Sequence, residues 1–253
     1  MAASSGAAYV AVTALSHDGL IREHNEDSVV VGPWTLCATV TENPQTLLFP
    51  VGTPLVVAVA DGLGGHPGGE VASAIVVREL ALAGPGLSDA AAVTTAVRDC
   101  NRAVHDAAAG RPELSAMGTT VAGLVLTSDE VIVFNVGDSR VYTHGADGLR
   151  QVSVDDSPPL APGQRSTVIV TQTLGGQPDL APVDPHVRGL PLDQGVRFLI
   201  CTDGLSDVVD GETLESLLRE HGDGRAAYEL WKAAIAGGGP DNITLALVRL
   251  DRQ

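Results

Sequence analysis

Short runs of apolar residues, many of them β-branched, recur along the chain and predict β-strands. Each run is four to eight residues long, which is the usual length of a strand in a globular protein. Residues 127–130, between two of these runs, are polar and turn-forming and therefore predict a hairpin. The predicted strands cover residues 9–15, 28–31, 55–60, 120–126, 131–136, 140–143, 196–202 and 243–250.

Apolar residues at helical spacing predict four helices between these strands. The second helix should begin with Ser88 as its N-cap and Asp89 in its first turn, and should run for about 20 residues. The other three are predicted at residues 69–83, 211–220 and 225–236. Because helices and strands do not alternate strictly, the pattern favours an α+β fold of antiparallel sheets with helices packed outside.

The amino-acid composition is typical of a globular protein, and the net charge excludes some classes of binding partner. Of the 253 residues, 44% are hydrophobic and only 3% aromatic, so aliphatic side chains must build the core. No linker or repeat divides the chain, and we expect residues 1–253 to form a single domain. The formal net charge of −16 argues against nucleic acid and anionic membranes as partners. Solubility and a carboxylate-lined cation site are two compatible explanations of that charge.

Cysteine usage and hydropathy predict a cytoplasmic protein. The three cysteines are odd in number and widely spaced, and they form neither a zinc pattern nor a disulfide framework. The first residues lack the charged and apolar regions of a signal peptide, and no apolar run is long enough to span a membrane.

Acidic residues at the ends of apolar strands are the main chemical signal. Asp61 and Asp203 each follow a predicted strand and precede a glycine, and Asp241 lies just before the last strand. Each of them alone is as readily a turn residue, but the three together with Glu26 and Asp27 favour a cation site. Carboxylate oxygens suit Mg²⁺ and Mn²⁺, whereas zinc usually recruits histidine or cysteine.

Arg22 adds a candidate anion-binding group four residues before Glu26. A guanidinium can bind a phosphate through two parallel hydrogen bonds. An isolated arginine is more often a surface charge, but beside a carboxylate cation site Arg22 becomes a candidate phosphate ligand.

Six short segments spread through the chain combine these acidic, glycine and hydroxyl residues. They are Arg22-Glu23-His24-Asn25-Glu26-Asp27, Asp61-Gly62-Leu63-Gly64-Gly65-His66 with Gly69-Glu70-Val71-Ala72-Ser73, Met117-Gly118-Thr119-Thr120, Asn135-Val136-Gly137-Asp138-Ser139-Arg140, Thr202-Asp203-Gly204-Leu205-Ser206-Asp207 and Asp241-Asn242-Ile243-Thr244. Each is weak evidence alone, but in this order they resemble the metal-dependent protein phosphatases of type 2C, and in particular the bacterial branch.

The resemblance implies a fold, an activity and a set of roles. The fold would be a four-layer α-β-β-α sandwich of two antiparallel sheets flanked by helices, with a two-metal site in a cleft at one edge. A metal-activated water would attack the phosphate without a phosphoenzyme. Arg22 would bind the substrate phosphate, and Asp61 would bridge two divalent cations, Mn²⁺ or Mg²⁺. The implied metal ligands are Glu26, Asp27, Asp61, the carbonyl of Gly62, Asp203 and Asp241.

The chain departs from the family pattern in three places. Leu63 stands where eukaryotic members often carry a histidine as the proposed general acid, so the leaving group would be protonated by His66, by a metal-bound water or by no residue at all. A structural role at the helix start is the alternative for His66. Glu113 is the nearest acid before the Met-Gly-Thr-Thr segment, so a tight third metal site is not expected. Residues 155–172 are fewer than the usual flap, which predicts a shortened flap and a more open cleft.

Other residues of the six segments are expected to be structural. Asp138 would hold a turn, and Arg140 would form an ion pair inside the domain. Gly118, Thr119 and Thr120 would lie at the entry of a strand.

The expected function is hydrolysis of phosphoserine and phosphothreonine on proteins, opposing a Ser/Thr kinase in bacterial signalling. The enzyme would be a monomer that binds neither nucleic acid nor membrane. One alternative is a catalytically weak pseudo-phosphatase that binds or senses a partner, against which the complete acid set argues. Another is a two-metal hydrolase of small phosphoesters or nucleotides, but the chain has no phosphate-loop or dinucleotide glycine pattern.

Overall fold

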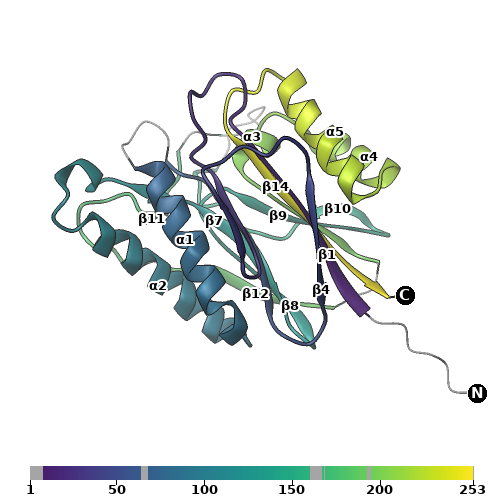
Figure 1. Ribbon diagram of the computed structural model, residues 1–253, viewed down its shortest axis with the longest axis horizontal. Helices are drawn as coiled ribbons and strands as arrows, with labels where there is room; N and C mark the ends of the chain where they lie inside the picture. The colour runs from purple at the N-terminus through teal and green to yellow at the C-terminus, as the bar shows by residue number, and fades with distance from the viewer. Residues whose placement is uncertain (1–7, 64–67, 160–166, 168, 193–194, 253) are drawn as a thin grey trace, which may run out of the picture.

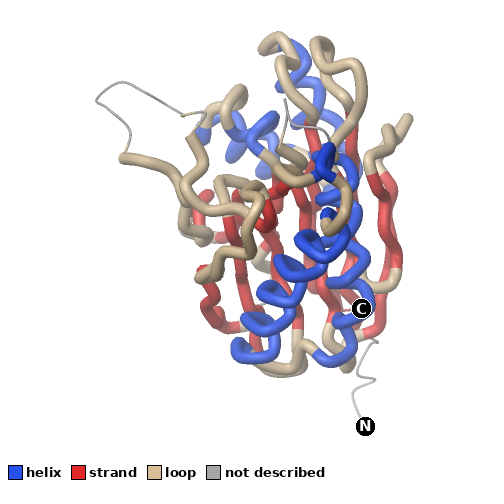
Figure 2. The backbone as a smooth tube through the Cα atoms, turned by 90° about the vertical axis from the view of Figure 1, so that its left-hand side faces the viewer, coloured by secondary structure: helices blue, strands red, loops and turns tan. Residues whose placement is uncertain are grey.

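The computed structural model of the protein describes residues 8–63, 68–159, 167, 169–192 and 195–252. Two six-stranded antiparallel sheets lie at its centre, with helices on both outer faces (Figure 1). Figure 2, turned by 90°, shows the helices of one outer layer in front of the strands. This arrangement confirms the α-β-β-α sandwich.

The first sheet contains the strands nearest both ends of the described chain. β14 lies in its middle and pairs with β1 over ten residues, from Ala8 opposite Arg252 to His17 opposite Ile243. Its strands, in spatial order, are β10 (Gly148–Gln151), β9 (Arg140–Gly145), β13 (Arg197–Cys201), β14 (Ile243–Arg252), β1 (Ala8–His17) and β4 (Gln45–Pro50).

The second sheet is built around β5, whose six residues are all buried. Its strands, in spatial order, are β12 (His186–Pro191), β8 (Glu130–Val136), β7 (Val121–Leu126), β5 (Leu55–Ala60), β2 (Ser28–Val31) and β3 (Trp34–Cys37). A two-stranded ladder joins β6 (Gly118–Thr119) to β11 (Leu174–Gly175). The predicted hairpin is confirmed, because β7 and β8 pair directly around residues 127–130.

Three apolar cores separate the four layers. Along β5, Val56, Ala58 and Ala60 face the helices, whereas Val57 and Val59 face the first sheet, so burial on both sides explains the unbroken apolar run. α1 (Gly69–Ala83) and α2 (Ala90–Ala108) cover the second sheet. α3 (Asp203–Ser206), α4 (Gly211–Glu220) and α5 (Asp223–Ala236) cover the first sheet.

Several boundaries differ from the prediction. Asp89, not Ser88, is the N-cap of α2: its backbone is extended, and its Oδ1 accepts a hydrogen bond of 2.9 Å from the Ala92 amide. α5 begins at Asp223, two residues earlier than expected. The sequence also missed β3, β4, β10 and β12, which lie at or next to the sheet edges and are only partly buried.

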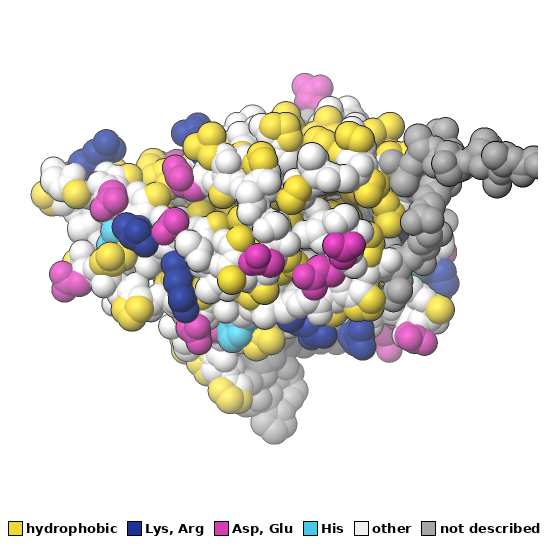
Figure 3. All heavy atoms as spheres, turned by 90° about the horizontal axis from the view of Figure 1, so that it is seen from below, with side chains coloured by type: hydrophobic (Ala, Val, Ile, Leu, Met, Phe, Trp, Pro, Cys, Tyr) yellow, Lys and Arg dark blue, Asp and Glu magenta, His cyan; other side chains and the backbone are white. Residues whose placement is uncertain are grey.

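The surface mixes charged and apolar side chains. Figure 3 shows acidic and basic groups interspersed with apolar ones on one face. Among the described residues, no helix is long and apolar enough to cross a membrane.

Candidate active site

Strand ends from the two sheets meet at one edge of the sandwich. In the second sheet, Ser28 pairs with Ala60, so the preceding Asp27 and the following Asp61 lie at the same end of β2 and β5. A hydrogen bond of 2.9 Å from Thr202 Oγ1 to Asp27 Oδ2 joins this end to the first sheet, where Asp203 follows β13. The sheet packing therefore gathers carboxylates from distant parts of the sequence.

Burial and mutual repulsion perturb these carboxylates strongly. Burial, with the charges of Asp203 and Asp241 added to it, raises the pKa of Asp27 to about 8. Burial and the charges of its acidic neighbours raise the pKa of Asp61 well above its usual value. For Asp203, burial and the charge of Asp241 raise the pKa to about 6. Without a counter-charge, the cluster resists full ionisation at neutral pH.

Two carboxylate oxygens of this cluster are buried without a hydrogen-bond donor among the described residues. They are Oδ1 of Asp27 and Oδ1 of Asp203. An unpaired buried carboxylate oxygen is costly unless a cation or a donor meets it. An all-oxygen set of clustered carboxylates with unpartnered oxygens fits hard divalent cations such as Mn²⁺ and Mg²⁺.

Gly62 brings the backbone after β5 against two other segments. A Cβ atom at Gly62 would lie 2.5 Å from the carbonyl carbon and oxygen of Gly69 and 2.8 Å from the carbonyl oxygen of Glu26. Because only glycine fits there, the turn after Asp61 can lie directly against the start of α1.

The residues before β7 hold the Asp61 backbone. Thr119 Oγ1 donates to the Asp61 carbonyl at 2.7 Å, and the Thr120 amide donates to the same oxygen at 2.9 Å. Gly118 accepts from the Leu63 amide at 3.0 Å through its carbonyl. These contacts agree with the structural role expected for the three residues.

Arg22 lies beside the carboxylate cluster at the protein surface. Its Nη2 donates to Asp241 Oδ2 at 2.8 Å, and the two side chains are 39% and 32% exposed. A guanidinium has five N–H donors, so this contact leaves an arginine suited to a solvent-borne anion as well.

The amide of Asn242 fastens the loop that carries Arg22. Its Nδ2 donates to the carbonyls of Asp18 and His24, each at 3.1 Å, and its Oδ1 accepts from the Glu26 amide at 2.8 Å. Both ends of the loop are thus tied to the segment just before β14.

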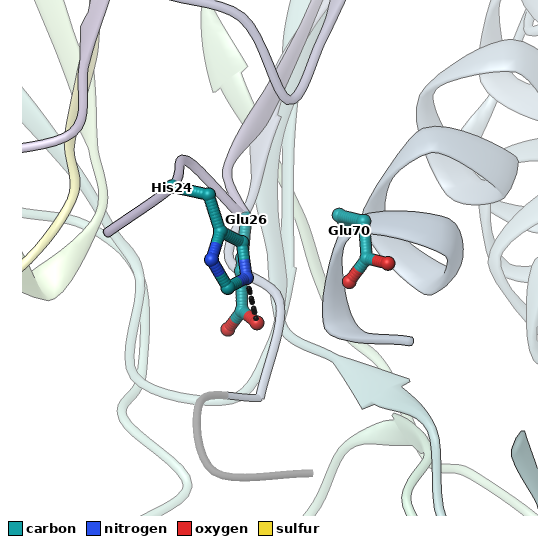
Figure 4. Close-up of side chains that lie close together, drawn as sticks. All are labelled: His24, Glu26 and Glu70. Carbon is teal, nitrogen blue, oxygen red and sulfur yellow. Dashed lines mark hydrogen bonds and ion pairs between the residues drawn. The ribbon is translucent and has the colours of Figure 1, made fainter. Parts of the chain in front are cut away.

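A second polar group lies next to Gly62. His24 Nε2 and Glu26 Oε1 are 3.0 Å apart, and Glu70 from the first turn of α1 points toward them (Figure 4). One ligand atom from each of the three residues lies within 4.8 Å of the others, which is close enough to surround a cation.

The comparisons with known proteins decide the family. The model of the protein phosphatase 2C family matches residues 49–230, which is more than half of the chain. This chain belongs to the protein phosphatase 2C family. The type 2C resemblance inferred from the sequence is thereby confirmed. The bacterial branch and the fold are confirmed by the relatives and the solved structure that follow.

Two curated relatives are bacterial serine/threonine phosphatases. PstP of Mycobacterium tuberculosis is 32% identical over 92% of this chain, but the chain spans only 44% of the length of PstP. The phosphatase stp of Listeria monocytogenes is 31% identical, over 92% of this chain and 93% of its own length.

One solved structure shows which metal ions a relative binds. The catalytic domain of PstP in complex with two manganese ions is 31% identical, has a TM-score of 0.78, and is matched over 96% of this chain and 99% of its own. That relative therefore holds two manganese ions on the same fold.

In this phosphatase 2C chain, the described candidates fall into one region. Asp27, Asp61 and Asp203 interact with one another, Asp241 pairs with Arg22, and Gly62 contacts Glu26. His66 lies outside the described residues.

Two other motif residues lie beside the cluster. Arg140 donates from Nε and Nη2 to Asp155 Oδ2 at 2.9 and 2.7 Å, which is the internal ion pair that was expected. Burial, aided by the charge of Asp203, raises the pKa of Asp138 to about 7. Asp138 therefore belongs to the electrostatics of the cluster as well as to its turn.

Sequence reasoning assigned no role to Thr202, Asn242, His24 or Glu70. The position of Asn242 directly after Asp241 was the available signal, but its contacts reach residues more than 200 positions away in the sequence.

Proposed function

We propose that this chain hydrolyses phosphoserine and phosphothreonine in proteins and depends on divalent cations for that activity. One observation carries the proposal: buried carboxylate oxygens that have no hydrogen-bond partner in the described part of the chain lie in a cluster beside a partly exposed arginine. Membership of the protein phosphatase 2C family supports it. The chain would be a catalytic domain that opposes a Ser/Thr kinase.

The proposed cation ligands are the oxygen donors of the cluster. When bound, divalent cations lower the pKa of water and offset negative charge on a phosphate. The burial of Asp27 and of Asp203 Oδ1 would keep bulk water from competing for these oxygens, and Thr202 would hold the Asp27 carboxylate in place. The proposed ligands are Glu26, Asp27, Asp61, the carbonyl oxygen of Gly62, Asp203 and Asp241.

Arg22 is the proposed ligand of the substrate phosphate. The Asp241 carboxylate orients its guanidinium, and Asn242 ties down the loop on which it stands. A bidentate contact with two phosphate oxygens would orient the phosphorus toward the cluster and leave the serine or threonine oxygen pointing outward. His66 stays a candidate for proton transfer to the leaving group.

The domain and cellular context follow the same proposal. We infer a single catalytic domain over residues 1–253, with a shortened flap at residues 155–172. We expect a cytoplasmic monomer that acts on phosphorylated proteins and binds neither nucleic acid nor membrane.

The test is phosphate release from a phosphothreonine peptide by purified protein in Mn²⁺, in Mg²⁺ and in EDTA. Release should require metal and should be lost in Asp61→Asn, whose circular dichroism should match that of the wild-type protein. Arg22→Ala should chiefly raise KM. Absence of release with either metal, from folded protein, would favour the pseudo-phosphatase, and faster release from nucleotides than from peptides would favour a small-substrate hydrolase.

A further inference from the structure

Two exposed apolar side chains lie next to Arg22. Leu20 is 60% exposed and Ile21 is 69% exposed. The residues that follow them, Arg22 to His24, are also exposed, and Arg22 reaches the carboxylate cluster through Asp241. Neighbouring large apolar residues that are exposed and rimmed by polar residues are typical of contact regions.

The loop that carries these side chains is held in one position. The Leu20 amide donates to the Gly239 carbonyl at 2.8 Å, and the Gly19 amide donates to His17 Nδ1 at 2.9 Å. Gly19 has φ +76°, and a Cβ there would lie 2.2 Å from the Asp241 carbonyl oxygen. With these contacts and the Asn242 amide, the loop presents its apolar side chains to solvent without rearrangement.

The apolar surface continues onto α5. A Cβ placed on Gly239 would lie 3.2 Å from both Leu20 Cγ and Ile235 Cδ1, so Leu20 and Ile235 approach the same glycine. Ile235 is half-buried and belongs to the edge of the core between α5 and the first sheet. Leu20 therefore connects the surface beside the site to a packed helix.

We propose that Leu20 and Ile21 contact the residues flanking the phosphorylated residue of a substrate protein and select apolar flanks. This inference rests on the proposed function, because it places the phosphate at Arg22. Each step along a chain moves the Cα atom by about 3.8 Å, so Leu20 and Ile21, two and one positions from Arg22, lie close enough to it to contact substrate residues near the phosphoresidue.

Charge near the loop sets the order of preference. Asp18 and Glu23 each lie two residues from the apolar pair, in a chain whose net charge is −16. Arg22, between the apolar pair and Glu23, is paired with Asp241. Acidic flanks would meet like charge, whereas apolar flanks would bury surface against Leu20 and Ile21. The expected order of flanking residues is leucine, then glutamine, then glutamate.

The experiment compares phosphothreonine peptides that differ only in the residues on either side of the phosphothreonine: leucine, glutamine or glutamate. The wild-type enzyme with Mn²⁺ should prefer the leucine peptide over the glutamine peptide by about fivefold in kcat/KM, and the Leu20→Gln/Ile21→Gln double variant should lose this preference. Leu82→Gln is the matched control, because Leu82 is 77% exposed on α1 and should leave the preference unchanged. All three proteins should hydrolyse para-nitrophenyl phosphate, which has no flanking residues, at equal rates.

A charge swap gives a second test that does not rely on losing a contact. Ile21→Lys should raise kcat/KM for the glutamate peptide relative to the leucine peptide by about fivefold. The inference is overturned if the wild-type enzyme does not distinguish the leucine and glutamine peptides, or if the double variant keeps the wild-type order. Failure of the wild-type protein on every peptide and on para-nitrophenyl phosphate would instead overturn the proposed function, and the inference with it.

Discussion

Replacing Asn242 with alanine should misplace Arg22 without removing any group proposed to touch substrate. Asn242 is 5% exposed, and its amide makes three hydrogen bonds to the backbone of the Arg22 loop. The variant leaves the buried amide of Glu26 without its acceptor and removes the donor shared by two carbonyls.

The magnitude follows from those three contacts. An unsatisfied buried donor costs about 1–3 kcal/mol, and two partly hydrated carbonyls add roughly 1 kcal/mol together, so unfolding free energy should fall by about 2–4 kcal/mol. A displacement of about 1 Å at a positioning group can lower catalysis by about 10²-fold, and we expect a loss of that order in kcat/KM, mainly through KM.

The assay combines urea unfolding with steady-state hydrolysis of a phosphothreonine peptide in Mn²⁺. Val133→Ala is the control, because Val133 is 1% exposed in the core between the sheets and its truncation should cost about 2 kcal/mol without touching the loop. The control should lose stability but keep kcat/KM. If Asn242→Ala is equally destabilised and retains kcat/KM within about twofold, the loop does not depend on this amide and our reasoning is wrong.

Three further predictions concern the carboxylate cluster. Gly62→Ala should weaken Mn²⁺ binding at least about tenfold by calorimetry, since its methyl group would overlap the Gly69 carbonyl. In metal-free protein, the contribution of Asp27 to stability should fall as the pH rises from about 4 to about 8, because the folded state keeps Asp27 protonated up to about 8 whereas the unfolded chain releases that proton near 3.8. Thermal melts over this range should therefore show a weaker pH dependence in Asp27→Asn than in the wild-type protein. Mn²⁺ should raise the melting temperature more at pH 8 than at pH 5, because it binds ionised carboxylates; an equal rise at both values would argue against a carboxylate cation site.

The inner strands could be predicted from the sequence because buried strands consist mainly of apolar residues. β5 is apolar at every position since both of its faces are covered, and β7 and β13 are buried throughout for the same reason. β4 and β12 were not predicted because they lie at sheet edges, where their side chains are partly exposed and show no clear apolar pattern. Such a strand is defined by its backbone pairing, which does not depend on particular residue types.

The candidate site also contains some residues that could be predicted from the sequence and some contacts that could not. Asp61 and Asp203 were predictable because each directly follows an apolar strand, a local feature of the chain. The bond from Thr202 to Asp27 was not, because it joins two sheets across 175 positions of sequence. Contacts of this kind depend on how the sheets pack, and no single stretch of sequence contains both partners.

The position of β14 bears on how the protein acquires its activity during synthesis. β14 lies between β13 and β1 in the first sheet, and β1, the first strand of the described chain, pairs with it along its whole length (Figure 1). The ribosome must therefore make residues 243–252 before β1 finds this neighbour. Such long loop closures slow folding. A nascent chain that ends before Asp241 also lacks a member of the acid cluster, so the proposed phosphatase activity should appear in one step, after residues 241–252 have been made, and should not build up gradually.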